Sequence, residues 1–215
     1  MPDEPRAVGG DVSDAGNQTI ELNQPYTVRL IITGDAPILM HRWQSDAVQA
    51  KADAVKGSAA KKTDNVDSYV WRDDNGMICL PGEYVRGSLI DPRNGAAKYQ
   101  QDPRSSRKSA LDLFRAGVVS LTDLAVLIRA DGSKADAWDY IDRRRVTVQR
   151  AGITRERPAF AAGWSAEFEF MVLLPQYINP RLLHRTLVDG GRLVGVGDFR
   201  PTFGRFSVTR WEVAY

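Results

Sequence analysis

Apolar and polar residues alternate most clearly between positions 164 and 174. The apolar set is Trp164, Ala166, Phe168 and Phe170, and the polar set is Ser165, Glu167 and Glu169. A period of two places every second side chain on the same face of an extended chain. The pattern therefore predicts a β-strand with one buried face. β-Branched and apolar density predicts further strands at residues 26–33, 38–40, 124–128 and 203–213.

A spacing typical of helices follows Asn179-Pro180. An asparagine cap followed by proline at the first helical position is a helix-start signal. The apolar stripe consists of Leu182, Leu183, Leu187 and Val188. Gly190-Gly191 predicts the end of this helix. Shorter helices are predicted at residues 83–90 and 109–116, and from Asp46 onward.

Turn signals separate these elements. Asn75-Gly76 lies between two apolar runs and predicts a β-hairpin, because this dipeptide adopts positive φ at little steric cost. A second hairpin, rich in arginine, is predicted at residues 143–157. Composition also predicts a disordered acidic tail at residues 1–23, a surface loop at 57–67 and a polar, basic linker at 101–108.

The order of these elements indicates an α+β fold. Strands and helices mix without the regular βαβ spacing of a doubly wound sheet, and the split βαβ, ferredoxin-like arrangement fits best. We therefore expect one domain at residues 24–215 with a ferredoxin-like core, an inserted β-hairpin and inserted loops. The insertions are expected near residues 57–67 and 129–163.

Composition excludes several classes of protein. The 215 residues include one cysteine, Cys79, and two histidines, His41 and His184. These counts exclude an internal disulfide and a cysteine-rich or histidine-rich metal centre. No apolar run approaches the roughly 20 residues that span a bilayer, and the N-terminus shows no secretory signal. We therefore expect a cytoplasmic protein without membrane association, bound metal or cofactor.

The net charge of +2 conceals an asymmetry along the chain. Residues 143–215 contain twelve arginines, no lysine and six acidic residues, a local balance of +6, which leaves −4 for residues 1–142. Arginine matches planar anions such as phosphate better than lysine does. The C-terminal third therefore predicts a phosphate-bearing partner. A basic face that balances the acidic tail, or that pairs within an oligomer, would have the same composition.

Glycine and arginine concentrate between residues 190 and 206. Five glycines and three arginines fall within these 17 residues. Successive free amides can form an anion-binding nest, beside which Arg192, Arg200 and Arg205 would contact phosphates. The alternative is that the glycines serve only tight turns and close packing of the last strand. A dinucleotide-binding fingerprint is excluded, because Arg200 replaces its third glycine and a strand follows.

Two segments resemble the RAMP superfamily of CRISPR-associated proteins, which bind or process guide RNA. Residues 80–89 (LPGEYVRGSL) are similar to a Pro-Gly-Ser-Ser-Leu segment of that family, with Glu83-Tyr84 in place of the serine pair. Residues 195–206 are similar to its C-terminal glycine-rich loop. The resemblance implies a ferredoxin-like, RRM-related core, a loop that lies against RNA, and a thumb-like hairpin at 143–157. Asp91-Pro92 departs from the family, whose helix continues, and a phage or mobile-element relative is equally compatible.

These features together predict a non-catalytic protein that binds single-stranded nucleic acid, either RNA or DNA, with RNA favoured. Aromatic rings stack on unpaired bases, and the candidates are Trp43, Trp71, Tyr84, Phe199 and Phe203. The predicted binding residues are Arg42, Trp43, Arg86, Arg143, Arg144, Arg145, Arg150, Arg155, Arg157, Arg192, Gly195, Gly197, Arg200, Phe203, Gly204 and Arg205. Self-association along the strand, or membership of a ribonucleoprotein complex, is expected from the resemblance.

His41 is the candidate catalytic residue. RNA-processing members of the same superfamily cleave without metal and use a histidine near the first helix, and Arg42 would stabilise a developing phosphorane. Packing under Trp43 and passive contact with phosphate are the alternatives for His41, and His184 is assigned to the structure. Two further functions therefore stay open: a metal-independent endoribonuclease, and a phage or mobile-element assembly protein whose basic face meets an acidic partner.

Overall fold

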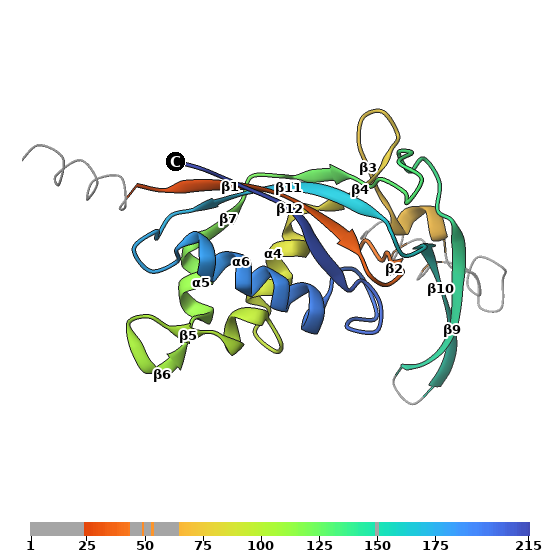
Figure 1. The fold of residues 1–215 in the computed structure, drawn as a ribbon. Helices are drawn as coiled ribbons and strands as arrows, with labels where there is room; N and C mark the ends of the chain where they lie inside the picture. Colours follow the sequence, from red (N-terminus) through yellow and green to blue (C-terminus); the bar gives the residue numbers. More distant parts are fainter. Residues whose placement is uncertain (1–23, 44–48, 50–52, 54–64, 149–150) are drawn as a thin grey trace, which may run out of the picture.

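A four-stranded antiparallel sheet forms the centre of the protein. The computed structural model describes residues 24–43, 49, 53, 65–148 and 151–215. The strands are β1 (Tyr26–Gly34), β7 (Val118–Ser120), β11 (Ser165–Val172) and β12 (Phe206–Ala214), in the order β12-β1-β11-β7 (Figure 1). All three neighbouring pairs are antiparallel. The alternation at residues 164–174 therefore belongs to a central strand of this sheet.

The connections between these strands confirm the ferredoxin-like core. Helix α4 (Gly82–Ile90) precedes β7, and helix α6 (Pro180–Asp189) lies between β11 and β12. Numbered along the chain, the sheet strands lie in the order fourth, first, third, second. This is the split βαβ topology with two crossover helices. The fold class predicted from the sequence is correct.

Both crossover helices and α5 (Leu111–Gly117) cover the same face of the sheet (Figure 1). The core lies between the layers, and its largest fully buried side chains are Trp164, Tyr26, Phe114, Phe160, Phe168, Phe170 and Phe206. The Trp164 indole N–H donates to the carbonyl of Ala36 at 2.9 Å, so its one polar atom is satisfied. The assignment of Trp164, Phe168 and Phe170 to the core is confirmed.

Helix α6 begins and ends as the sequence predicts. The Asn179 side chain accepts a hydrogen bond from the Leu182 amide at 2.9 Å. The α-helix ends at Asp189, before Gly190-Gly191, and the chain continues as a π-helical turn, η3 (Gly190–Val194). Gly191 permits close packing here, because a Cβ on it would lie 2.0 Å from the Phe206 carbonyl oxygen. Val188 is 40% exposed and therefore does not belong to the buried stripe.

The arginine-rich hairpin forms as predicted. Strands β9 (Tyr140–Val148) and β10 (Ala151–Phe160) pair along their whole lengths. Only the base of β10 continues into a third strand, β2 (Ile38–Leu39), through Ala159 and Phe160. The rest of the hairpin projects beyond the helices as a two-stranded ribbon (Figure 1).

Two smaller sheets flank the core. Strands β3 (Trp71–Arg72), β4 (Ile78–Pro81) and β8 (Leu124–Val126) form the first of these sheets and include the predicted hairpin, whose Gly76 has φ +78°.

The prediction of a linker at residues 101–108 is wrong. This segment forms a second small hairpin of β5 (Gln101–Asp102) and β6 (Ser105–Ser109), because Asp102 accepts the Arg104 amide at 2.8 Å in a tight turn.

The remaining elements are two short 3₁₀ helices, η1 (Val66–Tyr69) and η2 (Ala96–Tyr99). The predicted tail at 1–23, most of the helix expected from Asp46, and most of the loop expected at 57–67 lie outside the described residues. Within the described part of the chain, no helix is long and apolar enough to cross a membrane.

Candidate nucleic-acid interface

Most amides of the loop at residues 195–205 are hydrogen-bonded within the protein. The amides of Gly195, Val196, Asp198 and Gly204 donate at 2.8–2.9 Å to the carbonyls of Gly190, Gly204, Leu39 and Pro37, respectively. The loop is therefore folded onto itself and onto the segment around β2. The predicted anion-binding nest is wrong, because these donors are already used inside the protein.

The glycines of this loop permit close packing instead. Gly197 has φ +79°, and a Cβ there would lie 2.5 Å from the Leu39 carbonyl oxygen. Gly204 has φ +70°, and a Cβ there would lie 1.7 Å from the Val196 carbonyl oxygen. No other residue fits either position without moving the backbone. The alternative stated from the sequence, tight turns and close packing, describes these glycines correctly.

Most of the predicted arginines are paired with carboxylates of the same chain. The pairs are Arg86–Glu83 (3.2 Å), Arg143–Glu156 (2.7 Å), Arg144–Asp142 (2.6 Å), Arg157–Asp198 (2.6 Å), Arg192–Asp189 (2.9 Å) and Arg200–Asp91 (3.7 Å). Three of these pairs use acidic residues that the local balance of +6 already includes. Among the partners of arginines in residues 143–215, only Asp142 and Asp91 lie outside that segment, so the pairs offset two of its six net positive charges. Arg145 and Arg205 are exposed, whereas Arg150 lies outside the described residues.

Two of the predicted binding residues support the fold instead. The Arg157 side chain is 6% exposed, and its Nε donates to Asp198. The Arg86 guanidinium donates to the carbonyls of Val118 at 2.8 Å and Arg115 at 3.0 Å. A guanidinium whose donors satisfy main-chain or buried carboxylate oxygens is not available to phosphate.

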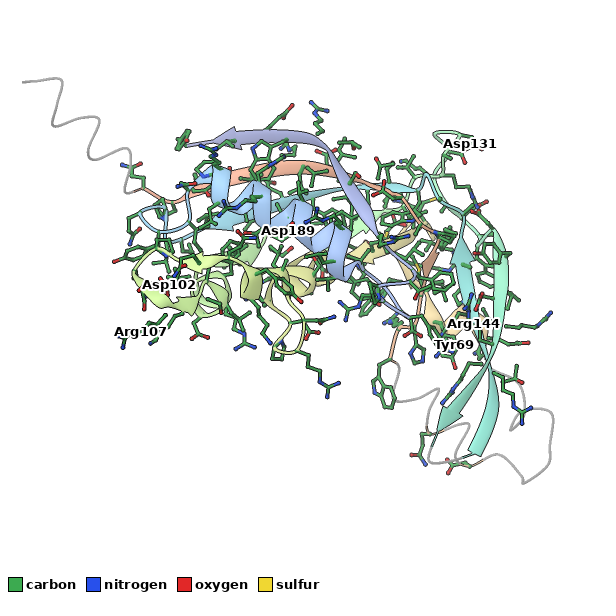
Figure 2. All side chains as sticks on the ribbon, turned by 60° about the horizontal axis from the view of Figure 1, so that its bottom comes forward. Tyr69, Asp102, Arg107, Asp131, Arg144 and Asp189 are labelled. Atoms are coloured by element: carbon green, nitrogen blue, oxygen red, sulfur yellow. The ribbon has the colours of Figure 1, made fainter. Side chains whose placement is uncertain are left out.

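Cation–aromatic contacts join the base of the hairpin to the loop. The Arg144 guanidinium lies 4.3 Å from the Phe203 ring centroid and 5.9 Å from that of Phe199. Arg157 lies 5.9 Å from Phe199 and 5.4 Å from Tyr69 of η1. Phe203 is 8% exposed, so its ring packs in this cluster and does not present a stacking surface. Figure 2 shows Tyr69 and Arg144 close to the projecting ribbon.

The segment after β2 carries the exposed aromatic ring that the prediction requires. Trp43 is 71% exposed, and the neighbouring Arg42 guanidinium lies 4.3 Å from the Trp71 ring centroid. Trp43 therefore has an open face for a base, whereas Trp71 is already covered by a cation.

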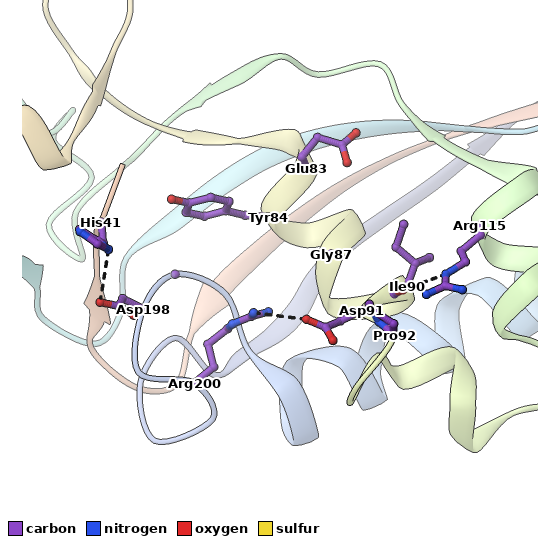
Figure 3. Close-up of a pocket in the computed structure, with 11 residues that line it drawn as sticks. His41, Glu83, Tyr84, Gly87, Ile90, Asp91, Pro92, Arg115, Asp198 and Arg200 are labelled. Atoms are coloured by element: carbon purple, nitrogen blue, oxygen red, sulfur yellow. Dashed lines mark hydrogen bonds and ion pairs between the residues drawn. The ribbon is translucent and has the colours of Figure 1, made fainter. Parts of the chain in front are cut away.

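A cleft opens between α4 and residues 197–200 (Figure 3). Its volume is about 420 Å³, and its lining is His41, Glu83, Tyr84, Gly87, Ile90, Asp91, Pro92, Arg115, Gly197, Asp198 and Arg200. His41 Nδ1 lies 4.0 Å from Asp198 Oδ2, and the imidazole meets the Tyr69 ring edge-on at 4.7 Å between centroids. Burial raises the pKa of the Tyr84 hydroxyl, so this side chain is a neutral donor and acceptor at physiological pH.

The open face of the sheet is acidic and lacks aromatic rings among its described residues. Glu167, Glu169 and Glu212 lie on this face with Arg29 and Arg210. Arg29 lies 3.4 Å from Glu167, and Arg210 lies 2.6 Å from Glu212. Bases cannot stack there as they do on an RRM sheet, because that surface depends on aromatic side chains.

A second basic surface lies on η2 and the β5–β6 hairpin, and this hairpin stands in place of the polar, basic linker that the sequence predicts. Arg107 and Lys108 are exposed and form no ion pair within the described ranges, and Tyr99 is 63% exposed. Figure 2 shows Arg107 at the end of the molecule opposite Arg144. The sequence signal for this hairpin that was overlooked is Asp102-Pro103, a dipeptide that favours a turn.

No group of three or more His, Cys, Asp or Glu side chains in the described part of the chain could hold a metal ion.

Comparisons with known proteins give matches of fold only. No protein-family model matches the chain, and no curated protein matches it. A structure of the type III-B Cmr-beta complex bound to cognate target RNA contains a chain 12% identical to this one, with a TM-score of 0.47, over 95% of this chain and 68% of that one. A structure of the Csm3–Csm4 subcomplex of a type III-A CRISPR-Cas interference complex contains a chain 14% identical, with a TM-score of 0.36, over 89% of this chain and 78% of that one.

At 12–14% identity and with TM-scores below 0.5, neither match carries an argument about this chain. The roles of individual residues are therefore argued from its own geometry alone.

Proposed function

We propose that the protein binds single-stranded nucleic acid, RNA in preference to DNA, along the β9–β10 hairpin and the segment 41–43, without cleaving it. The observation that carries the proposal is the ribbon itself, which projects from the body (Figure 1) and carries the exposed side chains of Arg143 and Arg145. The resemblance to the RAMP superfamily favours RNA.

The ion pair of Arg143 does not prevent it from binding phosphate. Its side chain is 66% exposed, and an exposed pair contributes only about 0–1 kcal/mol, so a phosphate can replace the Glu156 carboxylate at little cost. Arg145 is exposed and forms no ion pair within the described residues, so it can bind a phosphate without first breaking an ion pair. Trp43, 71% exposed, supplies the ring on which an unpaired base stacks.

Fluorescence anisotropy with a labelled short oligouridine tests this proposal. The double variant Arg143→Gln/Arg145→Gln should weaken binding about tenfold. The slope of log K against the logarithm of the salt concentration should become shallower by about 1.4, since each phosphate contact on a single strand contributes about 0.7 to that slope. Trp43→Ala should weaken binding about tenfold with an unchanged salt slope, because stacking involves no counterion release. Oligodeoxyuridine and a duplex, measured alongside, should bind more weakly.

The matched control removes two exposed cations from the opposite end of the molecule. Arg107→Gln/Lys108→Gln changes the net charge by the same amount, and affinity should change by less than about twofold. Equal losses in both double variants would show that binding follows net charge and not the hairpin. No binding of any oligonucleotide at low salt would refute the proposal and favour an assembly protein with an acidic protein partner.

A metal-independent endoribonuclease is the second candidate function. It is favoured by the position of His41 in the cleft, where Asp198 lies 4.0 Å away and Arg200 also lines the wall. Labelled RNA incubated with the protein in EDTA should stay intact if the protein only binds. Cleavage that is lost in His41→Ala would establish the enzyme instead.

Self-association along a strand, and membership of a ribonucleoprotein complex, extend the same proposal. Light scattering of the protein with and without a long single strand tests them. The mass per strand should rise in steps of one chain as the protein is added.

A further inference from the structure

The middle of α4 contains a glycine that neither packing nor backbone conformation explains. A Cβ on Gly87 would meet no atom within 4 Å, whereas a Cβ on Gly82 of the same helix would lie 2.1 Å from the Thr122 carbonyl oxygen. Glycine is the poorest helix former after proline, so an unneeded glycine weakens the helix. The space above Gly87 belongs to the cleft between α4 and residues 197–200 (Figure 3).

Arg200 lies on the opposite wall with its hydrogen-bonding capacity largely unused. Its side chain is 28% exposed, and its ion pair within the described residues is with Asp91 at 3.7 Å. A charge-assisted hydrogen bond is about 2.7–2.9 Å long, so neither group is satisfied by the other. Asp91 Oδ1 accepts the amides of Arg93 and Asn94, which leaves Oδ2 facing the cleft. The guanidinium N–H donors of Arg200 and the carboxylate oxygen Oδ2 of Asp91 thus lie side by side.

The turn that directs Arg200 into the cleft is strained. Phe199, the preceding residue, has φ +54°, a left-handed conformation that is unfavourable for a bulky side chain. Its amide donates to Asp198 Oδ1 at 3.0 Å, and Asp198 Oδ2 is held by Arg157. Strain of this kind persists where surrounding contacts enforce it, and it gathers at ligand sites.

The charges of the cleft favour a neutral ligand over a phosphate. Three carboxylates, Glu83, Asp91 and Asp198, face two guanidiniums, and that of Arg115 already donates to the Ile90 carbonyl at 3.3 Å. A volume of about 420 Å³ lies within the range of small-molecule sites, about 300–1,000 Å³. A planar nucleobase, which carries donors and acceptors without charge, suits this lining, and the Tyr84 ring supplies a stacking surface.

Among the four bases, guanine matches the pair of groups left unsatisfied. Its O6 accepts from a guanidinium, and its adjacent N1–H and N2–H groups donate to a carboxylate. Adenine, cytosine and uracil do not offer two neighbouring donors beside such an acceptor. We propose that this cleft is a pocket for one unpaired guanine, in which Arg200 donates to O6 and Asp91 accepts from N1–H and N2–H. Tyr84 and Gly87 line the wall and floor.

The guanine can come from a bound strand or from a free nucleotide, and only the first source rests on the proposed function. Calorimetric titration of the full chain with the four nucleoside monophosphates tests the pocket directly. Anisotropy with oligouridine, and with the same oligomer carrying one central guanosine, tests the strand-borne base. We expect guanosine, as nucleotide or in the strand, to bind about tenfold tighter than the other bases, since a matched bidentate contact discriminates by about that factor or more.

Three variants assign the preference to the cleft. Arg200→Gln and Asp91→Asn should each reduce the guanine preference about tenfold. Gly87→Leu should abolish it by filling the floor, while oligouridine affinity stays within about twofold, and the variant folds because leucine is a better helix former than glycine. Arg192→Gln is the matched control: it removes an arginine from the same region that pairs with an aspartate outside the cleft, and the preference should persist.

Each outcome decides between the two proposals. Selective binding of guanosine monophosphate without oligouridine binding would support the pocket and refute the strand-binding function. Guanosine preference only in the strand would support both and identify the strand as the source. Equal binding of all bases in both assays, or an unchanged preference in Gly87→Leu, would overturn the pocket.

Discussion

Replacing Asp198 with asparagine removes one charge from a buried ion pair and keeps the size of the side chain. Arg157 Nε lies 2.6 Å from Asp198 Oδ2, and the Arg157 side chain is 6% exposed. An asparagine oxygen at this position can still accept the Phe199 amide, now at 3.0 Å from Oδ1. The substitution therefore isolates the loss of the carboxylate charge beside a buried guanidinium.

The expected loss of stability follows from the burial of the two partners. Breaking a buried ion pair costs about 3–5 kcal/mol, because the remaining charge has no partner. The Asp198 side chain is 31% exposed, so water partly solvates the site and the loss should lie near about 2–3 kcal/mol. In a domain of this size about 1 kcal/mol corresponds to about 2–4 °C, so Tm should fall by about 4–12 °C.

Thermal and guanidinium melts followed by circular dichroism at neutral pH measure this loss. The double variant Arg157→Leu/Asp198→Asn should recover part of it, because no unpaired charge stays buried. Glu212→Gln, which breaks the exposed pair with Arg210, is the matched control and should leave Tm within about 1 °C. An Asp198→Asn variant that melts within about 1 °C of the original protein would refute the reasoning.

Three further predictions follow from single contacts. Gly87→Ala should raise Tm by about 1–4 °C, because alanine stabilises a helix by about 0.5–1 kcal/mol over glycine and the space is open; a thermal melt measures the rise. Gly204→Ala should lower stability by more than about 2 kcal/mol in a guanidinium titration, because φ is +70° and its Cβ would overlap the Val196 carbonyl. Arg104 hydrogen-bonds Asp102 and lowers the pKa of that carboxyl, so its contribution is present above the ordinary pKa of about 3.9 and is lost as pH falls through the lowered value. Arg104→Gln should therefore move the acid-unfolding midpoint, followed by circular dichroism, to higher pH.

The fold was predictable because its signals are local. The alternation at residues 164–170 reports a strand with one face in the core, whatever its neighbours are. The Asn179 cap needs only the next three residues to form its hydrogen bond. The paired strands of the arginine-rich hairpin were likewise visible in the sequence. Local patterns of this kind determine most elements of the core and their order.

The site was less predictable because its contacts join distant residues. Arg157 and Asp198 are 41 positions apart, and Arg200 meets Asp91, so the sequence does not show which arginines are compensated. The glycines of the 195–205 loop look the same whether their neighbours are free amides or packed backbone. The two cases differ in whether each amide has a hydrogen-bond acceptor within the protein. The acceptor of the Asp198 amide is the Leu39 carbonyl, which lies far away in the sequence and is brought close only by the tertiary fold.

Asp198 also connects the two proposed binding regions. One of its oxygens holds Arg157 of β10, and the other holds the strained Phe199 amide that precedes Arg200. The hairpin base and the turn that precedes Arg200 are thus both hydrogen-bonded to the same carboxylate. Loss of this carboxylate should therefore weaken the guanine preference although Asp198 need not touch the base, whereas the exposed arginines of the hairpin should affect strand affinity and leave base preference unchanged.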